Sequence, residues 1–105
     1  MAYSLDWTLN SQNELNQIYD YLEENWTDRE ICIFSTKLEK TLILICKFPF
    51  MYQKSDQNAN IRRCVLSSQT SIYYYVDTQK ENITILSFFD NRQNPNKLNL
   101  ELYQN

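Results

Sequence analysis

The first residues of the chain alternate between apolar and polar side chains. Tyr3, Leu5, Trp7 and Leu9 are separated by polar residues, a period of two that is typical of a strand with one buried and one solvated face. Residues 11–14 (Ser-Gln-Asn-Glu) then fit a capping box, in which a serine oxygen and a glutamate satisfy free backbone N–H groups. We therefore predict a strand over residues 3–9 and a helix that begins at Ser11.

Apolar residues next recur three and four positions apart, as on the buried face of an amphipathic helix. A second capping box, residues 27–30 (Thr-Asp-Arg-Glu), starts a second helix with almost no intervening loop. That helix must end before Pro49, because the residue ahead of a proline avoids helical backbone angles. The expected core positions are Leu15, Ile18, Leu22 and Trp26 in the first helix, and Ile31, Phe34, Leu38, Leu42 and Ile45 in the second.

Residues 50–60 lack periodicity and are predicted to form a loop, which contains Lys54. Three strands follow, over residues 61–66, 71–76 and 83–89, and their short connections predict an antiparallel meander. The last of these strands is apolar at nearly every position, which places it centrally in the sheet. The expected fold is α+β: a strand, a helical hairpin and a meander, with the helices on one face of a four-stranded sheet. Residues 96–105 fit either a short helix or an extended tail.

Composition restricts the classes of protein that the chain can belong to. A chain of 105 residues, 43% of them apolar, predicts a single globular domain over residues 1–105. No apolar run approaches the roughly 20 residues of a membrane helix, so we expect a soluble, cytosolic protein without membrane contact. Three widely spaced cysteines offer no disulfide framework or CxxC site, and the sequence has no histidine. We expect no metal and no organic cofactor.

Charge is distributed unevenly along the chain. The first 30 residues hold seven carboxylates and one arginine, a net charge of −6, whereas residues 31–105 hold nine basic and six acidic groups, a net charge of +3. Proteins that bind long nucleic-acid duplexes carry a much stronger basic surface. The distribution therefore favours a local contact with an anion.

Arg92 is the first candidate for that contact. It follows an apolar strand and precedes the turn residues Gln93, Asn94 and Pro95, so a rigid scaffold would hold its guanidinium at the end of a strand. A solvated arginine in a turn is the alternative interpretation.

The meander supplies the other candidates. If Ile72 and Val76 face the helices, alternation turns Tyr73 and Tyr75 to the open face of the sheet. With Arg62 beside them and Arg92 at a neighbouring strand end, they would form a stacking and phosphate-binding surface of the kind that single-stranded RNA uses. Lys54 is the remaining candidate binding residue. The tyrosines could instead be cross-strand pairs that only stabilise the sheet, and Arg63 is interpreted as a snorkelling or ion-paired residue.

Four segments in this order carry a resemblance: residues 61–66 (IRRCVL), 71–77 (SIYYYVD), 83–86 (ITIL) and 89–95 (FDNRQNP). Together with the preceding strand and helical hairpin, they resemble the RelE/ParE superfamily of toxins from bacterial type II toxin–antitoxin modules, also known for plasmid stabilisation. The resemblance covers about residues 3–98 and implies a cytoplasmic growth inhibitor with a RelE/ParE-like fold.

The family has two functional branches. In the ribosome-dependent mRNA endonucleases, cations on the second and third strands and at the end of the fourth stabilise the cleaved phosphate; Arg62 matches the first and Arg92 the last. Ser71 and Cys64 stand where further cations would be, and Tyr103 lies further along than the usual tyrosine. The ParE-like branch inhibits DNA gyrase by protein contact and also suits an acidic pI of 4.8. The resemblance therefore favours a ParE-like inhibitor.

Two alternatives stay open beside that interpretation. One is a RelE-like endonuclease in which Arg62 and Arg92 are catalytic, and the other is a non-toxic interaction module derived from a toxin. In each case the resemblance implies one partner, a small cognate antitoxin that covers the helical hairpin and the open sheet face.

Overall fold

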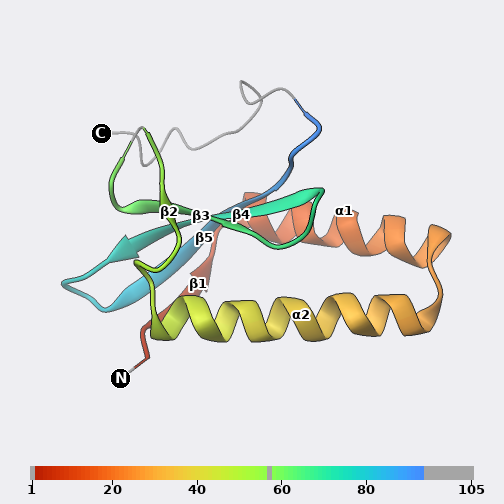
Figure 1. Ribbon diagram of the computed structural model, residues 1–105, viewed down its shortest axis with the longest axis horizontal. Helices are drawn as coiled ribbons and strands as arrows, with labels where there is room; N and C mark the ends of the chain where they lie inside the picture. Colours follow the sequence, from red (N-terminus) through yellow and green to blue (C-terminus); the bar gives the residue numbers. More distant parts are fainter. Residues whose placement is uncertain (1, 57, 94–105) are drawn as a thin grey trace.

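The structure, a computed structural model, describes residues 2–56 and 58–93 (Figure 1). Two helices pack on one face of a five-stranded mixed sheet, which confirms the predicted α+β class. The predicted tail, residues 96–105, lies outside the described residues. In chain order the elements are β1 (Ser4–Trp7), α1 (Leu9–Asn25), α2 (Asp28–Lys47), β2 (Gln53–Lys54), β3 (Ile61–Val65), β4 (Thr70–Asp77) and β5 (Asn82–Asp90).

The strands lie in the order β1-β5-β4-β3-β2, with β1 parallel to β5 and the other pairs antiparallel. The meander and the inner position of β5 are confirmed. The fifth strand was not predicted, because β2 has only two residues, Gln53 and Lys54, and two residues have no period. The register between β4 and β5 shifts between Tyr73 and Tyr74, where an irregularity interrupts the pairing.

Helix α1 begins at Leu9, two residues before the predicted start at Ser11. Thr8 is its N-cap: the Thr8 side-chain oxygen accepts from the Ser11 backbone N–H at 3.1 Å. Glu14 does not reach back to a cap. Its carboxylate accepts from the Phe88 backbone N–H at 3.1 Å and from the Ser87 hydroxyl at 2.8 Å. Beyond Ile85, where β1 ends its pairing, Glu14 thus takes the place of a neighbouring strand at the edge of β5.

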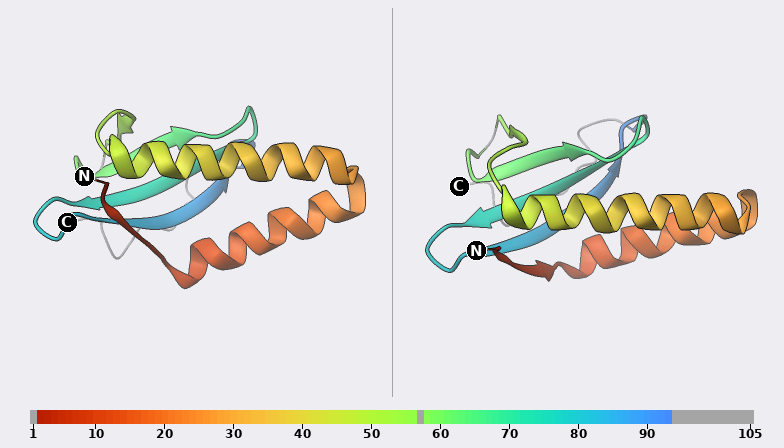
Figure 2. Two further views of the ribbon diagram at one scale, coloured as in Figure 1. Left: turned by 90° about the horizontal axis from the view of Figure 1, so that it is seen from below. Right: turned by 60° about the horizontal axis from the view of Figure 1, so that its bottom comes forward.

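The second helix agrees with the prediction at both ends. The capping box of Thr27 and Glu30 is formed, and α2 ends at Lys47 ahead of Pro49. The two helices make a hairpin whose closed end extends past the end of the sheet (Figure 2). Trp26, predicted as a core residue, lies at that end and is 40% exposed because no strand covers it. None of the described helices has both the length and the apolarity to cross a membrane.

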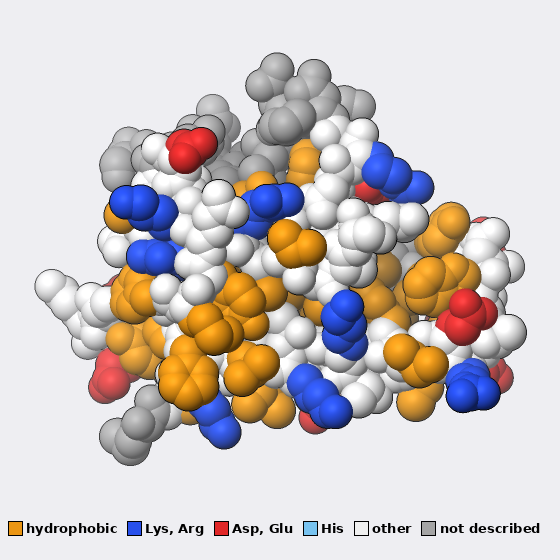
Figure 3. Space-filling view, in the orientation of Figure 1, with side chains coloured by type: hydrophobic (Ala, Val, Ile, Leu, Met, Phe, Trp, Pro, Cys, Tyr) orange, Lys and Arg blue, Asp and Glu red, His pale blue; other side chains and the backbone are white. Residues whose placement is uncertain are grey.

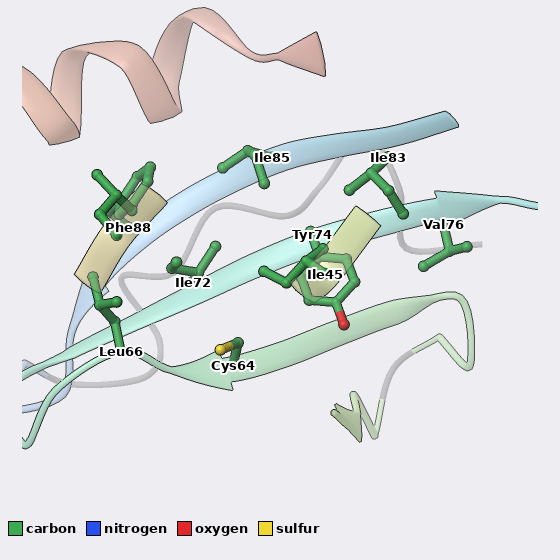
Figure 4. Close-up of a cluster of buried hydrophobic side chains, with 10 residues drawn as sticks. Ile45, Cys64, Leu66, Ile72, Tyr74, Val76, Ile83, Ile85 and Phe88 are labelled. Atoms are coloured by element: carbon green, nitrogen blue, oxygen red, sulfur yellow. The ribbon is translucent and has the colours of Figure 1, made fainter. Parts of the chain in front are cut away.

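The hydrophobic core lies between α2 and the three long strands. Ile45 of α2 lies close to Tyr74 of β4, with side chains of β3 and β5 around them (Figure 4). The Tyr74 hydroxyl donates to the Pro49 carbonyl at 2.7 Å, and burial raises the pKa of Tyr74. At the other end of the core, Trp7 of β1 stacks on Phe88 with 5.7 Å between ring centroids. The predicted inward positions, Ile72 and Val76, are buried in this core.

Candidate functional site

Arg62 lies on the helix side of the sheet. It is paired directly with the buried Tyr74, and directly opposed residues of paired strands point to the same face. Its guanidinium donates to the carbonyls of Ala59, Phe50 and Tyr52 at 3.2, 3.4 and 3.1 Å, and its Cζ lies 4.7 Å from the centre of the Phe50 ring. Arg62 therefore holds the loop after α2 against β3.

The prediction that Arg62 stands beside Tyr73 and Tyr75 is wrong. The pairing register puts Arg62 opposite Tyr74, so its side chain leaves the sheet on the other face. Arg62 and Arg92 are also far apart along the strands. Arg62 is level with Tyr74, whereas Arg92 follows Asp90, which is level with Thr70. Four residues of β4 separate these levels, roughly 13 Å at about 3.3 Å per residue.

Arg63 is the arginine that shares a face with the two tyrosines. It pairs directly with Tyr73, on the sheet face turned away from the helices, which we call the distal face. Ser71 and Asn91 fix its guanidinium: Arg63 Nε donates to Ser71 Oγ at 3.2 Å, and Nη2 donates to Asn91 Oδ1 at 3.3 Å. Ser71 Oγ in turn donates to Asn91 Oδ1 at 2.7 Å. Arg63 was interpreted as a snorkelling or ion-paired residue; among the described residues it forms hydrogen bonds to Ser71 and Asn91 and no ion pair.

The tyrosines lie on the distal face as predicted. Tyr73 and Tyr75 are half-buried and pack against the buried Ile61 and Leu86. Tyr73 also contacts Phe89 edge-on, with 6.3 Å between ring centroids. This packing agrees with the alternative that the two tyrosines stabilise the sheet. The N–H groups of Arg63 that are not bonded to Ser71 or Asn91 could still donate to an anion on this face.

Arg92 lies at the rim of a groove of about 290 Å³ between α1 and the end of β5. Its guanidinium makes two hydrogen bonds to the Asp90 carboxylate, at 3.1 and 2.9 Å, and the side chain is 67% exposed. Hydrogen bonding from Arg92 lowers the pKa of Asp90. Tyr21 and Trp26 line the groove together with polar side chains such as Gln17 and Gln69, so Arg92 lies beside α1.

Glu14 is the one carboxylate of α1 that lines this groove. Burial raises the pKa of Glu14, and the hydrogen bonds from Ser87 and Phe88 oppose that rise. A carboxyl with a raised pKa is a candidate for proton transfer. Here, however, its hydrogen bonds tie it to the backbone edge of β5, which is a structural role.

The sequence did not predict that hydrogen bonds hold the side chains of Arg63, Asn91 and Glu14 in fixed positions. The signal for Arg63 was its strand position next to Arg62, but parity could not decide which of two adjacent arginines shares the tyrosine face. Lys54 is exposed on the edge strand β2 and pairs with Arg62, so it lies away from the distal face. Within residues 2–56 and 58–93, no group of three acidic, cysteine or histidine side chains could hold a metal ion.

The sequence matches no protein family in a scan of family descriptions, and no curated protein matches it. Solved structures do match. The chromosomal ParDE toxin–antitoxin system of P. aeruginosa aligns over 85% of this chain and 96% of the other, with a TM-score of 0.67 and 16% identity. The toxin–antitoxin complex RelBE2 of Mycobacterium tuberculosis aligns over 86% and 99%, with a TM-score of 0.61 and 13% identity.

A third structure has the same architecture. A double arginine-to-alanine mutant of the E. coli toxin RelE, in the free state, aligns over 86% of this chain and 84% of its own, with a TM-score of 0.59 and 18% identity. This chain has the RelE/ParE toxin fold. In the RelE/ParE-like sheet described above, the three arginines of β3 and the β5 end occupy three separate surfaces. Arg62 is on the helix side, Arg63 is on the distal face and Arg92 is at the groove.

Proposed function

We propose that this chain is the toxin of a type II toxin–antitoxin module and that it acts in the cytoplasm by binding DNA gyrase. Its fold, shared with proteins of the ParDE and RelBE2 systems, supports a toxin role. A cognate antitoxin neutralises it. The distance between Arg62 and Arg92 along the sheet, and the placement of Arg62 and Arg63 on opposite faces, support action by protein contact, because cleavage of RNA requires several cations preorganised around one phosphate.

Charge chemistry at each arginine supports the same choice. Three backbone carbonyls engage Arg62 and a carboxylate engages Arg92, so neither guanidinium is held ready for a phosphate. On the distal face, Arg63 has no lysine beside it as a second cation within the part of the chain that the structure describes. Among the described residues it also forms no ion pair with a carboxylate. Removing one preorganised donor typically costs an enzyme about 10²–10³ in rate, so a site with one cation is a poor catalyst for this cleavage.

The test is inducible expression of the chain without its antitoxin, followed by three measurements on the same culture: growth, plasmid supercoiling and message integrity. We expect growth arrest with relaxed plasmid and intact messages, and purified chain should block supercoiling by gyrase in vitro. Normal supercoiling at saturating protein would overturn the gyrase proposal. Harmless expression of folded protein would instead support a non-toxic interaction module.

A ribosome-dependent mRNA endonuclease is the second candidate. One observation favours it: Arg63, Tyr73 and Tyr75 place a fixed cation beside aromatic rings, the combination that single-stranded RNA contacts. This candidate predicts discrete cuts in messages during growth arrest, lost in Arg63→Ala but kept in Lys80→Ala, a control in the β4–β5 turn. Arrest with uncut messages would exclude it.

A further inference from the structure

The loop that follows α2 exposes large apolar side chains at that end of the helix. Phe48, Phe50 and Met51 are 56%, 42% and 55% exposed, and Leu44, one turn earlier in α2, is 40% exposed. Figure 3 shows hydrophobic side chains gathered where α2 ends, with basic side chains among them. Grouped apolar side chains of this kind mark contact surfaces, whereas single ones are ordinary. We call this surface the loop patch: Leu44, Lys47, Phe48, Phe50, Met51 and Lys54.

Contacts with the rest of the fold hold the loop patch in its exposed form. Pro49 is buried in the middle of it, and the Pro49 carbonyl accepts from the Tyr74 hydroxyl at 2.7 Å. Arg62 donates to the Phe50 carbonyl at 3.4 Å and lies over the Phe50 ring. The backbone of the loop is therefore fixed before any partner arrives, and a partner that covers these side chains loses little affinity to ordering them.

The two ends of α2 carry opposite charge. Residues 20–30, at the closed end of the helical hairpin, hold five exposed carboxylates and one arginine, a net charge of −4: Asp20, Glu23, Glu24, Asp28, Glu30 and Arg29. Residues 40–55 hold three exposed lysines and no carboxylate, a net charge of +3: Lys40, Lys47 and Lys54. Asp56 and Glu81, on neighbouring connections, form no ion pair with these lysines among the described residues. The 20 residues of α2 separate the two ends by about 30 Å at 1.5 Å per residue (Figure 1).

Exposed aromatic rings accompany the carboxylates at the closed end. Tyr21 and Trp26 are 55% and 40% exposed there, where the hairpin extends past the sheet. We call this end, residues 20–30, the hairpin tip. Aromatic rings attract both methionine sulfur and lysine ammonium groups. The hairpin tip thus presents carboxylates and rings, the two kinds of group that complement the loop patch.

We propose that the chain associates with itself head to tail, with the hairpin tip of one copy on the loop patch of the next. The rings of the tip cover Phe48 and Met51, while Lys47 and Lys54 face its carboxylates. Such a contact joins two different surfaces, so each pair keeps one free tip and one free loop patch, and further copies add at high concentration. Both surfaces are small, so the contact is of the weak, transient class and a dilute chain is monomeric. This inference is independent of the gyrase proposal.

Two other occupants suit the loop patch less well. An anionic membrane surface would attract its lysines, but the chain as a whole has a net charge of −3 and is repelled. A nucleic acid meets the same repulsion, and three lysines are a much smaller basic surface than nucleic-acid-binding proteins carry. A second copy avoids this difficulty, because its hairpin tip brings the carboxylates into direct contact with the lysines.

The experiment is analytical ultracentrifugation of the full chain between about 10 μM and about 1 mM, the range of weak specific affinities. In about 50 mM salt, we expect the average mass to rise above 12.7 kDa as concentration increases, and in about 500 mM salt to return toward it, because salt screens exposed charges. Unchanged mass at the highest concentration in low salt would overturn the proposal.

One variant alters each surface. Glu23→Gln with Glu24→Gln neutralises part of the hairpin tip, and Phe48→Asp with Met51→Asp places carboxylates in the loop patch. We expect each variant alone to associate about tenfold more weakly than the parent chain. A mixture of the two should pair again, because the intact tip of one meets the intact loop patch of the other, and growth should stop at two chains. A mixture that does not pair would contradict a head-to-tail contact.

Matched controls lie outside both surfaces. Asp6→Asn with Glu39→Gln neutralises two exposed carboxylates, and Leu9→Asp with Val65→Asp charges two apolar positions that are 73% and 56% exposed. Both controls should associate as the parent chain does, and circular dichroism should show every variant folded. Association that the hairpin-tip variant leaves unchanged would overturn the proposal. So would binding to anionic vesicles that depends on the loop patch, if the chain alone stays monomeric.

Discussion

Arg62 illustrates how a conspicuous arginine can be structural. Its hydrogen bonds to Ala59, Phe50 and Tyr52 join the loop after α2 to β3. We predict that Arg62→Ala lowers the free energy of unfolding by about 1–2 kcal/mol, since a half-buried set of charged hydrogen bonds is lost. Arg92→Ala, whose side chain is 67% exposed, should leave the urea midpoint unchanged. Urea denaturation compares the two, and an unchanged midpoint in Arg62→Ala would contradict the clamp.

Tyr74 provides a second buried polar contact. Its hydroxyl is the donor to the Pro49 carbonyl at the end of α2. Tyr74→Phe keeps the ring but leaves that carbonyl without its partner, so we predict a loss of about 1–2 kcal/mol in the free energy of unfolding. Tyr21→Phe, at a 55% exposed position, is the control and should be neutral. Equal stability of both variants in thermal denaturation would refute the prediction.

Glu14 gives the molecule a pH-dependent contribution. Burial raises the pKa of Glu14 above the ordinary value of 4.5, so the folded chain binds its proton more tightly than the unfolded chain does. This adds to the free energy of unfolding in full below about pH 4.5, and the addition is lost as pH rises through the folded-state pKa. Glu14→Gln cannot ionise, so we predict that the variant gains stability relative to the parent chain between pH 4 and pH 7. Urea titrations of both chains across this range measure the difference. A pH-independent difference would show that Glu14 has no shifted pKa.

At the scale of the elements, Thr8 serves two structures at once. Its hydroxyl oxygen caps α1 and its hydroxyl proton is donated toward the carbonyls of Ile85 and Leu86 on β5, both at 3.1 Å. Thr27 caps α2 within an exposed capping box. We predict that Thr8→Ala costs about 2 kcal/mol and Thr27→Ala about 1 kcal/mol, because only Thr8 also joins a helix to the sheet. Equal costs in urea denaturation would mean that the sheet contact contributes nothing.

The same helix start shows where sequence reasoning stops. Ser11 and Glu14 fit a capping box in the sequence, but Thr8 is the observed cap, and Glu14 accepts instead from Ser87 and Phe88, which lie more than 70 residues away. Elements with a strong hydrophobic signal, such as the periodic α2 and the almost wholly apolar β5, were predicted close to their observed ends. The two-residue strand β2 has no period that could reveal it.

The candidate site was predictable in part for the same reason. Alternation within β4 correctly assigned Tyr73 and Tyr75 to the distal face. It could not assign Arg62 or Arg63, because the face of a residue on β3 depends on the register between β3 and β4. The engagement of Arg92 by Asp90 is different: the partner lies two residues away, so this ion pair could have been anticipated locally.

At the scale of the whole molecule, the two edge strands of the sheet differ in how much they contribute to the hydrophobic core. Strand β2 covers the outer edge of β3 with two exposed residues, Gln53 and Lys54. Strand β1 covers the edge of β5 and contributes Leu5 and Trp7 to the core, together with the adjacent Tyr3. Partly burying three such side chains contributes several kcal/mol at about 25 cal/mol per Å², a large share of the 5–15 kcal/mol that stabilises a typical domain.

We therefore predict that a chain beginning at Thr8 does not stay a folded monomer. Without β1, the apolar strand β5 has an unpaired edge over Asn82–Ile85, and such an edge pairs readily with other chains. Size-exclusion chromatography with light scattering should show aggregates, and thermal scans should show no cooperative transition. The substitution Lys54→Pro, which disrupts the opposite edge without removing core side chains, is the matched control and should remain monomeric. A monomeric, cooperatively folding truncation would mean that α1 alone protects β5.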